Sequence, residues 1–305
     1  MSANASEPQP CTLDTCPASL GFVGYRPTMA GNALFAAIYA VMLLAQVGLG
    51  IKGKTWTYLV AMSLGLVLEV VGYVGRILLY NDPFSFDAFI QYLVCLTIGP
   101  AFLTAAIYLT FTRVVYSCDA RLSVISPVKI SIVFMTCDFI CLVLQAAGGA
   151  ITATSNGSSD EAQSQRQQGV NIMIGGLAFH VVSLFFFICY ACVFAWRYRS
   201  ATARSARYRA QHRHGLRLSI ASVTIFARCI YRVAELRDGF DSSLAHDEVA
   251  FMVLEGAMIV IACLCLTAFH PGMCLDMDWK VEKAKTRGFV DDASYADLAN
   301  VHISK

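Results

Sequence analysis

Charged residues are scarce in this sequence, and lysine and histidine are nearly missing from its apolar parts. Asp, Glu, Lys and Arg make up 14% of the 305 residues, while apolar types make up 57%. Soluble domains usually carry about 25% charged residues. This shortage of charge excludes an ordinary soluble domain. We expect a membrane protein with membrane lipids as neighbours and with no nucleic-acid partner.

Lysine is absent from every long apolar segment, which excludes a retinal protein, because a Schiff base needs a buried lysine. Only His180 lies deep in such a segment, with His246 and His270 at segment ends, whereas a metal site needs several converging ligands. Gly48-Leu-Gly-Ile-Lys-Gly-Lys-Thr55 matches the phosphate-loop pattern but joins two membrane helices without an α/β domain. We therefore expect no metal, no cofactor and no enzymatic activity.

Seven apolar segments reach the length of about 20 residues that a membrane span needs. Their length and their lack of strict polar–apolar alternation favour helices over barrel strands. The sequence therefore predicts an all-α, polytopic membrane protein with a bundle of seven transmembrane helices (29–270) between short tails (1–28 and 271–305). The segments are Met29–Gly50, Trp56–Tyr80, Ala88–Thr112, Ile130–Ala153, Val170–Trp196, Leu218–Leu236 and Val249–Phe269.

Basic residues are missing from the first 25 positions, and no apolar run precedes the first segment. A cleaved signal peptide has both features, so we expect the first helix itself to direct insertion. Lys and Arg gather in cytosolic loops. With the N-terminus outside, 17 of the 23 basic residues lie on the inner side and three on the outer side. We predict an outside N-terminus and a cytosolic C-terminus, in the plasma membrane rather than an internal one.

Several outer features follow from this topology. Glycosylation sequons at Asn4 and Asn156 fall outside. Cys11 and Cys16 also lie outside, where a disulfide between them is a candidate and free thiols are the alternative. The segment Asn156–Gln168, rich in Ser, Gln and Asn, is predicted to be a flexible outer loop.

The longest predicted inner loop, Arg197–Arg217, has seven Arg, two His and no acidic residue. Such a stretch beside a helix end attracts anionic inner-leaflet lipid, by about 1 kcal/mol per basic residue. The alternative is that these arginines serve only to set the topology. Both interpretations stay open at this point.

Acidic and basic residues nevertheless occur inside four of the seven segments. Charge in hydrocarbon is costly unless it is paired or faces an internal cavity, so each such residue marks a candidate functional site. These residues are Glu69, Arg76, Asp138, Arg228, Arg232, Glu235 and Glu255.

Helical spacing places these charges on shared faces with polar neighbours. Glu69, Tyr73 and Arg76 share one face of the second segment, and Asp138 shares a face with Gln145 in the fourth. A similar stripe in the sixth segment consists of Arg228, Tyr231, Arg232 and Glu235. At a rise of about 1.5 Å per residue, most of the charges fall in the outer half of the bundle. We expect them to converge in one cavity that opens outward.

Four carboxylates face three guanidiniums in these segments, and two interpretations remain open. A near balance is typical of a structural ion-pair network. Alternatively, the charges line a path for an amphipath, in which the excess carboxylate suits a cationic amine or a proton and arginine suits an anionic group. Pro100 should also kink the third segment and free a carbonyl group, which in transporters marks either a binding site or only a bend.

The sequence also resembles the fungal RTA-like family of lipid-translocating exporters, over roughly Tyr25 to His270. The resemblance is carried by Tyr25-Arg-Pro27 with Asn32, Glu69-x-x-Gly72-Tyr73-x-x-Arg76, Gly99-Pro100-Ala101 with Tyr108 and Arg113, Asp138 with Gln145 and Gly148-Gly149, and Arg228-x-x-Tyr231-Arg232-x-x-Glu235 with Gly239. It implies a seven-helix fungal membrane protein tied to resistance against toxic amphipaths and to export of sphingoid long-chain bases. One branch is associated with porphyrin or haem traffic.

The leading hypothesis is a translocator of a lipid-like amphipath, such as a sphingoid long-chain base or a toxic sterol-like compound, without ATP hydrolysis of its own. Glu69 and Glu235 would meet a cationic head group or carry coupled protons, and the buried arginines would hold these carboxylates ionised or bind an anionic group. The predicted binding residues are Glu69, Tyr73, Arg76, Asp138, Gln145, Arg228, Tyr231, Arg232, Glu235 and Glu255. The alternatives are a receptor-like lipid sensor and a porphyrin-binding transporter with His180 as axial ligand.

Overall fold

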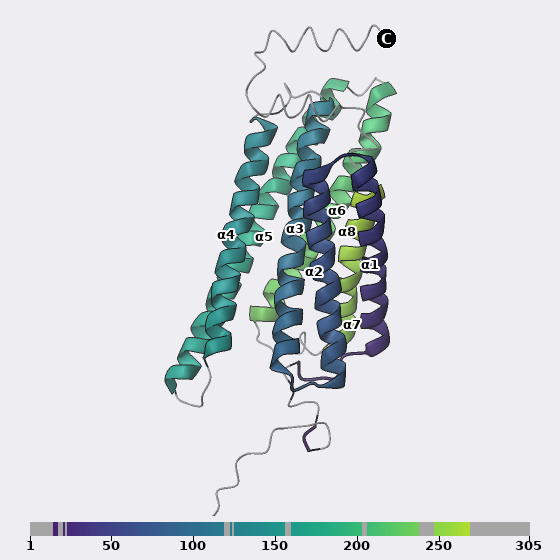
Figure 1. Cartoon of the computed structure of the whole chain (residues 1–305). Helices are drawn as coiled ribbons and strands as arrows, with labels where there is room; N and C mark the ends of the chain where they lie inside the picture. Colours follow the sequence, from purple (N-terminus) through teal and green to yellow (C-terminus); the bar gives the residue numbers. More distant parts are fainter. Residues whose placement is uncertain are drawn as a thin grey trace, which may run out of the picture.

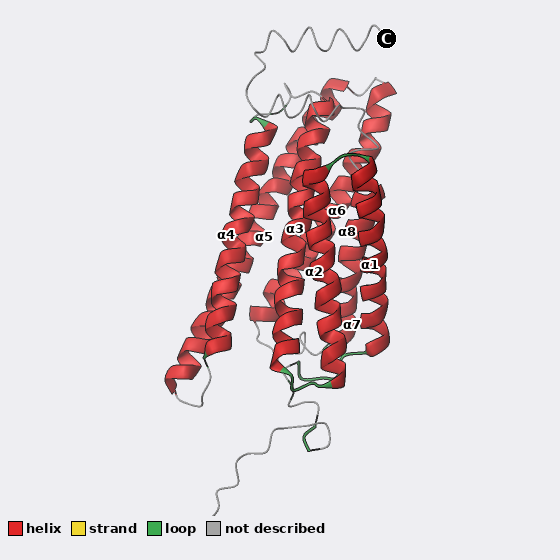
Figure 2. Ribbon diagram, viewed as in Figure 1, coloured by secondary structure: helices red, strands yellow, loops and turns green. Residues whose placement is uncertain are grey.

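The computed structural model describes residues 15–17, 21, 23–118, 123, 125–155, 160–202, 206–237 and 247–268. These residues form helices joined by short connections, with no strand among them (Figure 2). The predicted all-α fold is therefore confirmed. Asn4, Cys11 and Asn156 lie outside the described residues. Cys16 is bonded in a disulfide, so the candidate pairing with Cys11 stays a prediction.

Long helices run side by side along one axis of the molecule (Figure 1). They are α1 (Met29–Lys52), α2 (Trp56–Asn81), α3 (Phe86–Cys118), α4 (Pro127–Thr154), α5 (Asp160–Thr202) and α6 (Ala206–Arg237). The last predicted segment consists of three consecutive pieces: α7 (Glu248–Phe251), the π-helix η3 (Met252–Ala257) and α8 (Met258–Ala268).

Within the described ranges, six helical stretches are long and apolar enough to cross a membrane: α1 to α5, and α7, η3 and α8 taken together. The protein is therefore an integral, multi-pass membrane protein. α6 is not one of these six, because its acidic and basic residues lower its hydropathy. It nevertheless packs against α3, α5 and α8 inside the bundle. The seventh span and the direction of insertion stay predictions.

The outside of the bundle is apolar, and its interior holds polar side chains. Leu44, Phe139 and Trp196 are each at least 65% exposed, which suits side chains that face lipid. α3 lies in the middle, where it contacts α2, α4, α6 and α8. α1 packs against α2 and α8, and α4 packs against α5 (Figure 1). This arrangement brings polar residues of α3, α6 and η3 together.

Two predicted loops are largely helical, and both predictions were wrong in this respect. α5 begins at Asp160 within the predicted outer loop, and it continues to Thr202 within the predicted inner loop. α6 begins at Ala206. The outer extension starts with two acids, Asp160 and Glu161, which favour a helix N-terminus through the helix dipole. Gln is frequent in the extension that begins at Asp160, and Ala and Arg are frequent in the other; all three are good helix formers.

Gly148 allows α4 and α5 to approach each other closely. A Cβ atom there would lie 2.6 Å from the carbonyl oxygen of Gly169 and 2.8 Å from the backbone nitrogen of Met173. We expect Gly148→Ala to push the helices apart and to lower the free energy of unfolding by about 1–3 kcal/mol. The measurement is the thermal unfolding midpoint in detergent.

The adjacent Gly149 provides the matched control for this prediction. A Cβ atom on Gly149 would meet nothing closer than Sδ of Met173 at 3.9 Å. Gly149→Ala should leave the midpoint unchanged or raise it, because Ala is more favourable than Gly in a helix by about 1 kcal/mol. Equal midpoints for the two variants would contradict the predicted close approach.

Candidate functional site

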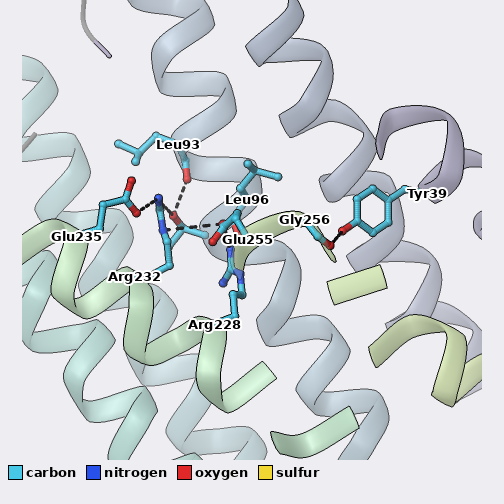
Figure 3. Close-up of polar contacts among 9 residues, drawn as sticks. Tyr39, Leu93, Leu96, Arg228, Arg232, Glu235, Glu255 and Gly256 are labelled. Atoms are coloured by element: carbon cyan, nitrogen blue, oxygen red, sulfur yellow. Dashed lines mark hydrogen bonds and ion pairs between the residues drawn. The ribbon is translucent and has the colours of Figure 1, made fainter. Parts of the chain in front are cut away.

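Four buried charged residues form a bonded group between α6 and η3, which we call the central cluster: Arg228, Arg232, Glu235 and Glu255 (Figure 3). The guanidinium of Arg228 donates to Oε1 of Glu255. Nη1 of Arg232 donates to Oε2 of Glu235 at 2.6 Å, and its Nε lies 4.0 Å from Oε1 of Glu255. Two guanidiniums therefore balance two carboxylates.

α3 contributes a carbonyl group and a hydroxyl group to this cluster. Pro100 has no N–H to donate to the carbonyl of Leu96, four residues earlier in the helix. That free carbonyl accepts a hydrogen bond from Nη2 of Arg228 (Figure 3). In addition, Nη2 of Arg232 donates to Oγ1 of Thr97 at 3.2 Å. The predicted effect of Pro100, a freed carbonyl, thus supplies the second acceptor of Arg228 beside Glu255.

The π-helical segment η3 carries Glu255. π-Helices interrupt α-helices rarely, and often at functional sites. The same segment directs the carbonyl of Gly256 toward α1, where it accepts a hydrogen bond from the hydroxyl of Tyr39 at 2.9 Å (Figure 3). Glu255 and the carbonyl of Gly256 therefore anchor the π-helical segment η3 to α6 and to α1, respectively.

Glu69 of α2 is buried beside the central cluster but is not bonded to it. Neither of its carboxylate oxygens has a hydrogen-bond partner among the residues that the structure describes. Its carboxylate interacts electrostatically with Arg228, Arg232 and Glu255. Gly99 of α3 makes room for it, since a Cβ atom there would lie 3.0 Å from Oε1. An unpaired buried carboxylate needs a proton or a cationic ligand.

Aromatic rings of α1 and α2 lie within electrostatic reach of Glu69. Tyr39 and Tyr73 stack at 5.5 Å between ring centroids, and Phe35 stacks on Tyr73 at 5.4 Å. Both tyrosines interact electrostatically with Glu69. The hydroxyl of Tyr73 is buried and has no hydrogen-bond partner within the described part of the chain. A carboxylate beside aromatic rings is an environment that suits an ammonium group.

Arg76 lies apart from the carboxylates, in an aromatic setting. Its Cζ is 3.8 Å from the ring centroid of Phe251 and 5.4 Å from that of Tyr92. Its Nε donates to Oδ1 of Asn32 at 3.0 Å, and its Nη2 donates to the hydroxyl of Tyr25 at 2.9 Å. Burial raises the pKa of that hydroxyl, although Arg76 opposes the shift, so Tyr25 is a neutral partner. Arg76 is therefore satisfied without a bonded acid.

Asp138 also lies apart from the central cluster, between α3 and α5. Its Oδ2 accepts a hydrogen bond from Thr104 at 2.8 Å, and its Oδ1 faces Nε2 of His180 at 3.6 Å. His180 is buried and directed at a carboxylate, so nothing in this arrangement favours a porphyrin ligand. Gln145 packs against Gly176 of α5 instead. The expected convergence of all seven charges in one cavity is therefore not observed, because Asp138 contacts Thr104 and His180, and Arg76 contacts neutral groups and aromatic rings.

Residues of the predicted N-terminal tail bond to the neighbouring ends of α2 and α7. Oγ1 of Thr28 donates to Oε2 of Glu248 at 2.7 Å. Nε of Arg26 donates to the carbonyl of Tyr80 at 2.9 Å, and its guanidinium lies 3.9 Å from the ring centroid of Tyr80. Together with Tyr25, these contacts tie the start of α1 to α2 and α7. In the sequence, the Tyr25-Arg-Pro27 motif was the feature that could have predicted these contacts.

Comparisons with known proteins identify relatives. The family model described as "RTA1 like protein" matches residues 62–278. A sphingoid long-chain base transporter, RSB1, from Saccharomyces cerevisiae (strain Lalvin EC1118 / Prise de mousse) is 30% identical over 285 residues, which cover 82% of this chain and 73% of the relative. Protein RTM1 of Saccharomyces cerevisiae is 27% identical over 221 residues, covering 69% of this chain and 66% of the relative. No solved structure matches the chain.

Proposed function

Because this chain belongs to the RTA1-like family, we propose that it is a transporter that moves a lipid-like amphipath with a cationic head group, such as a sphingoid long-chain base. One relative, a sphingoid long-chain base transporter, supports this substrate class. The observation that carries the proposal is Glu69, a buried carboxylate with no hydrogen-bond partner in the described chain.

The bonding pattern supports a cation rather than an anion as the substrate's head group. In the central cluster, Arg228 and Arg232 are matched by Glu255 and Glu235. Arg76 is satisfied by neutral groups and aromatic rings. Glu69 is the carboxylate left over next to the central cluster, and an ammonium group would supply the missing charge. Glu235 is bonded to Arg232, so we assign the head-group contact to Glu69 and a supporting role to Glu235.

The proposal includes the expected placement in the cell. We place the N-terminus outside and the C-terminus in the cytosol, with α6 as a seventh span, in the plasma membrane. The arginines of Arg197–Arg217 would then contact anionic lipid of the inner leaflet. In this topology the sequons at Asn4 and Asn156 and a disulfide between Cys11 and Cys16 lie outside. The relative RSB1 is named as a transporter, and we assign no catalytic role to any residue.

The test is transport by the purified full chain in liposomes with a labelled long-chain base. We expect saturable flux above that of protein-free liposomes, inhibited by an unlabelled long-chain base. An N-acylated long-chain base is the matched control competitor, because it keeps the chain but lacks the ammonium charge that Glu69 would bind, so it should inhibit poorly. Saturable binding without flux would contradict transport and support a receptor-like lipid sensor. Equal inhibition by both competitors would contradict the role of the charge.

A further inference from the structure

A second buried carboxylate, Asp138 of α4, is not used by the proposed contact between Glu69 and an amine. The side chains of Asp138 and His180 are each 5% exposed, and their facing atoms, Oδ1 and Nε2, are 3.6 Å apart. That distance is too long for a hydrogen bond. Neither atom has another hydrogen-bond partner within the described chain. Such buried, unsatisfied polar atoms are costly and call for a functional explanation.

Thr104 of α3 has one hydroxyl proton but two close oxygen neighbours. Its Oγ1 lies 2.8 Å from Oδ2 of Asp138 and 2.8 Å from the carbonyl oxygen of Ala101. A hydroxyl group has one proton to donate, whereas a carbonyl oxygen only accepts. With an ionised Asp138, Thr104 must share its one proton between the two oxygens. When Oδ2 of Asp138 carries a proton, it can instead donate to Thr104, which then donates to Ala101, and both contacts become full hydrogen bonds. The geometry therefore fits a protonated Asp138.

Within the described part of the chain, no Lys or Arg is bonded to Asp138. Hydroxyl and thiol groups face it: Thr104 and Tyr108 of α3, Cys141 of α4 and Cys229 of α6. Arg228 of α6 interacts electrostatically with His180 but is bonded to Glu255. A buried carboxylate without a paired cation is strongly unfavourable. Asp138 and His180 must therefore hold at least one proton between them.

We propose that Asp138 and His180 form a proton-binding pair that exchanges a proton for the transported amine. In one state the proton lies on Oδ2 of Asp138 and His180 is neutral. In the other, Asp138 has passed the proton to Nε2 of His180, Thr104 turns its hydroxyl toward Oδ2, and a carboxylate faces an imidazolium. One proton is conserved in this step, and its release from the imidazolium completes the exchange. The transport part of this proposal rests on the proposed function.

Arg228 provides the physical link between the pair and the amine site. It interacts electrostatically with both Glu69 and His180. An imidazolium at His180 and an ammonium group at Glu69 both add positive charge beside this guanidinium. The two positive charges therefore disfavour each other, so binding of the amine expels the proton and binding of the proton expels the amine. Such reciprocal coupling is a thermodynamic necessity once the two sites interact.

The first experiment tests the proton-binding pair without transport. Infrared difference spectra of the purified full chain across a pH series report the C=O stretch of a protonated carboxyl group. The Glu69→Gln background removes the contribution of Glu69. In this background we expect a carboxyl band that disappears as the pH is raised, and that is lost in the double variant with Asp138→Asn. An unchanged carboxyl band in the double variant would contradict the proposal that Asp138 binds the proton.

A second set of variants keeps that test informative if Asp138→Asn does not fold. Thr104→Val removes the hydroxyl relay and should shift the pH at which the carboxyl band disappears. Thr110→Val is the matched control, because Thr110 lies on the same helix and its hydroxyl donates to the carbonyl of Ala106. We expect no shift for the control. If the carboxyl band disappears at the same pH in both valine variants, the proposed role of the Thr104 hydroxyl is wrong.

The second experiment tests coupling in liposomes, with the rate of protein-free liposomes subtracted. We expect an imposed pH gradient to accelerate amine flux in the wild type and in Thr110→Val, but not in Asp138→Asn or His180→Gln. A retained gradient response in the Asp138 variant would overturn the proposal. Wild-type flux that ignores the gradient would overturn coupling while leaving the proposed function intact. Absence of saturable flux would contradict the proposed function, and the infrared result alone would then decide the proton-binding pair.

Discussion

Glu69→Gln should abolish saturable flux of a labelled long-chain base while the protein stays folded in its membrane. The substitution keeps the shape of the side chain and removes the charge that an ammonium group would meet. Loss of one partner of a buried charge pair costs about 2–5 kcal/mol, which corresponds to a loss of amine affinity of about 30-fold or more. The measurement is flux and equilibrium binding in liposomes with matched amounts of protein.

The Glu69→Gln variant should also be as stable as the wild type or more stable. Because Glu69 has no hydrogen-bond partner in the described chain, a neutral Gln leaves no bonded group behind. We expect an unfolding midpoint equal to or above that of the wild type, since an ionised buried carboxylate is costly. Glu161→Gln is the control for flux, because Glu161 is an exposed acid in the first turn of α5. Retained flux in Glu69→Gln at equal protein would refute the head-group assignment.

The largest loss of stability is expected for variants that break the pair between Arg228 and Glu255. Both side chains are at most 2% exposed, so removal of one leaves the other charged and unpaired. Such a change costs about 3–5 kcal/mol. Arg228→Met and Glu255→Gln should each lower the thermal unfolding midpoint strongly, as measured by the folded fraction remaining after heating in detergent. The same acid-to-amide change is thus harmless at Glu69 and damaging at Glu255.

A double variant distinguishes a broken pair from a general packing defect. When both members of a buried pair become neutral, the cost is often small. Arg228→Met combined with Glu255→Gln should therefore recover most of the stability that either change alone loses. Arg199→Met, at an exposed position near the end of α5, is the control and should have a small effect. If the double variant loses as much stability as the two single variants together, the ion pair is not the source of the stability.

Much of the candidate site could be predicted from the sequence. The spacing of Glu69, Tyr73 and Arg76 placed them on one face, and all three are buried. Pro100 predicted a free carbonyl, and the carbonyl of Leu96 is bonded to Arg228. These predictions succeeded because helical periodicity and the missing N–H of proline are local properties of the chain.

The partners of these residues could not be predicted in the same way. Depth along a helix axis follows from the number of residues, but the rotation of one helix against the next does not. Arg76 therefore meets aromatic rings rather than Glu69, and Asp138 meets His180 rather than the central cluster. The π-helical turn that presents Glu255 to Arg228 also carried no recognised sequence signal, because it depends on packing between η3, α1 and α6.

The sequence by itself determined that this protein is a helical membrane protein with costly charges inside its helices. That conclusion depends only on the free energy of placing charge and backbone in hydrocarbon, which is a property of composition and local periodicity. The tertiary structure alone decided which charges are paired and which are left over. Pairing depends on contacts between helices distant in sequence, and those contacts separate Glu69, which can take a cation, from Glu255, which already has one.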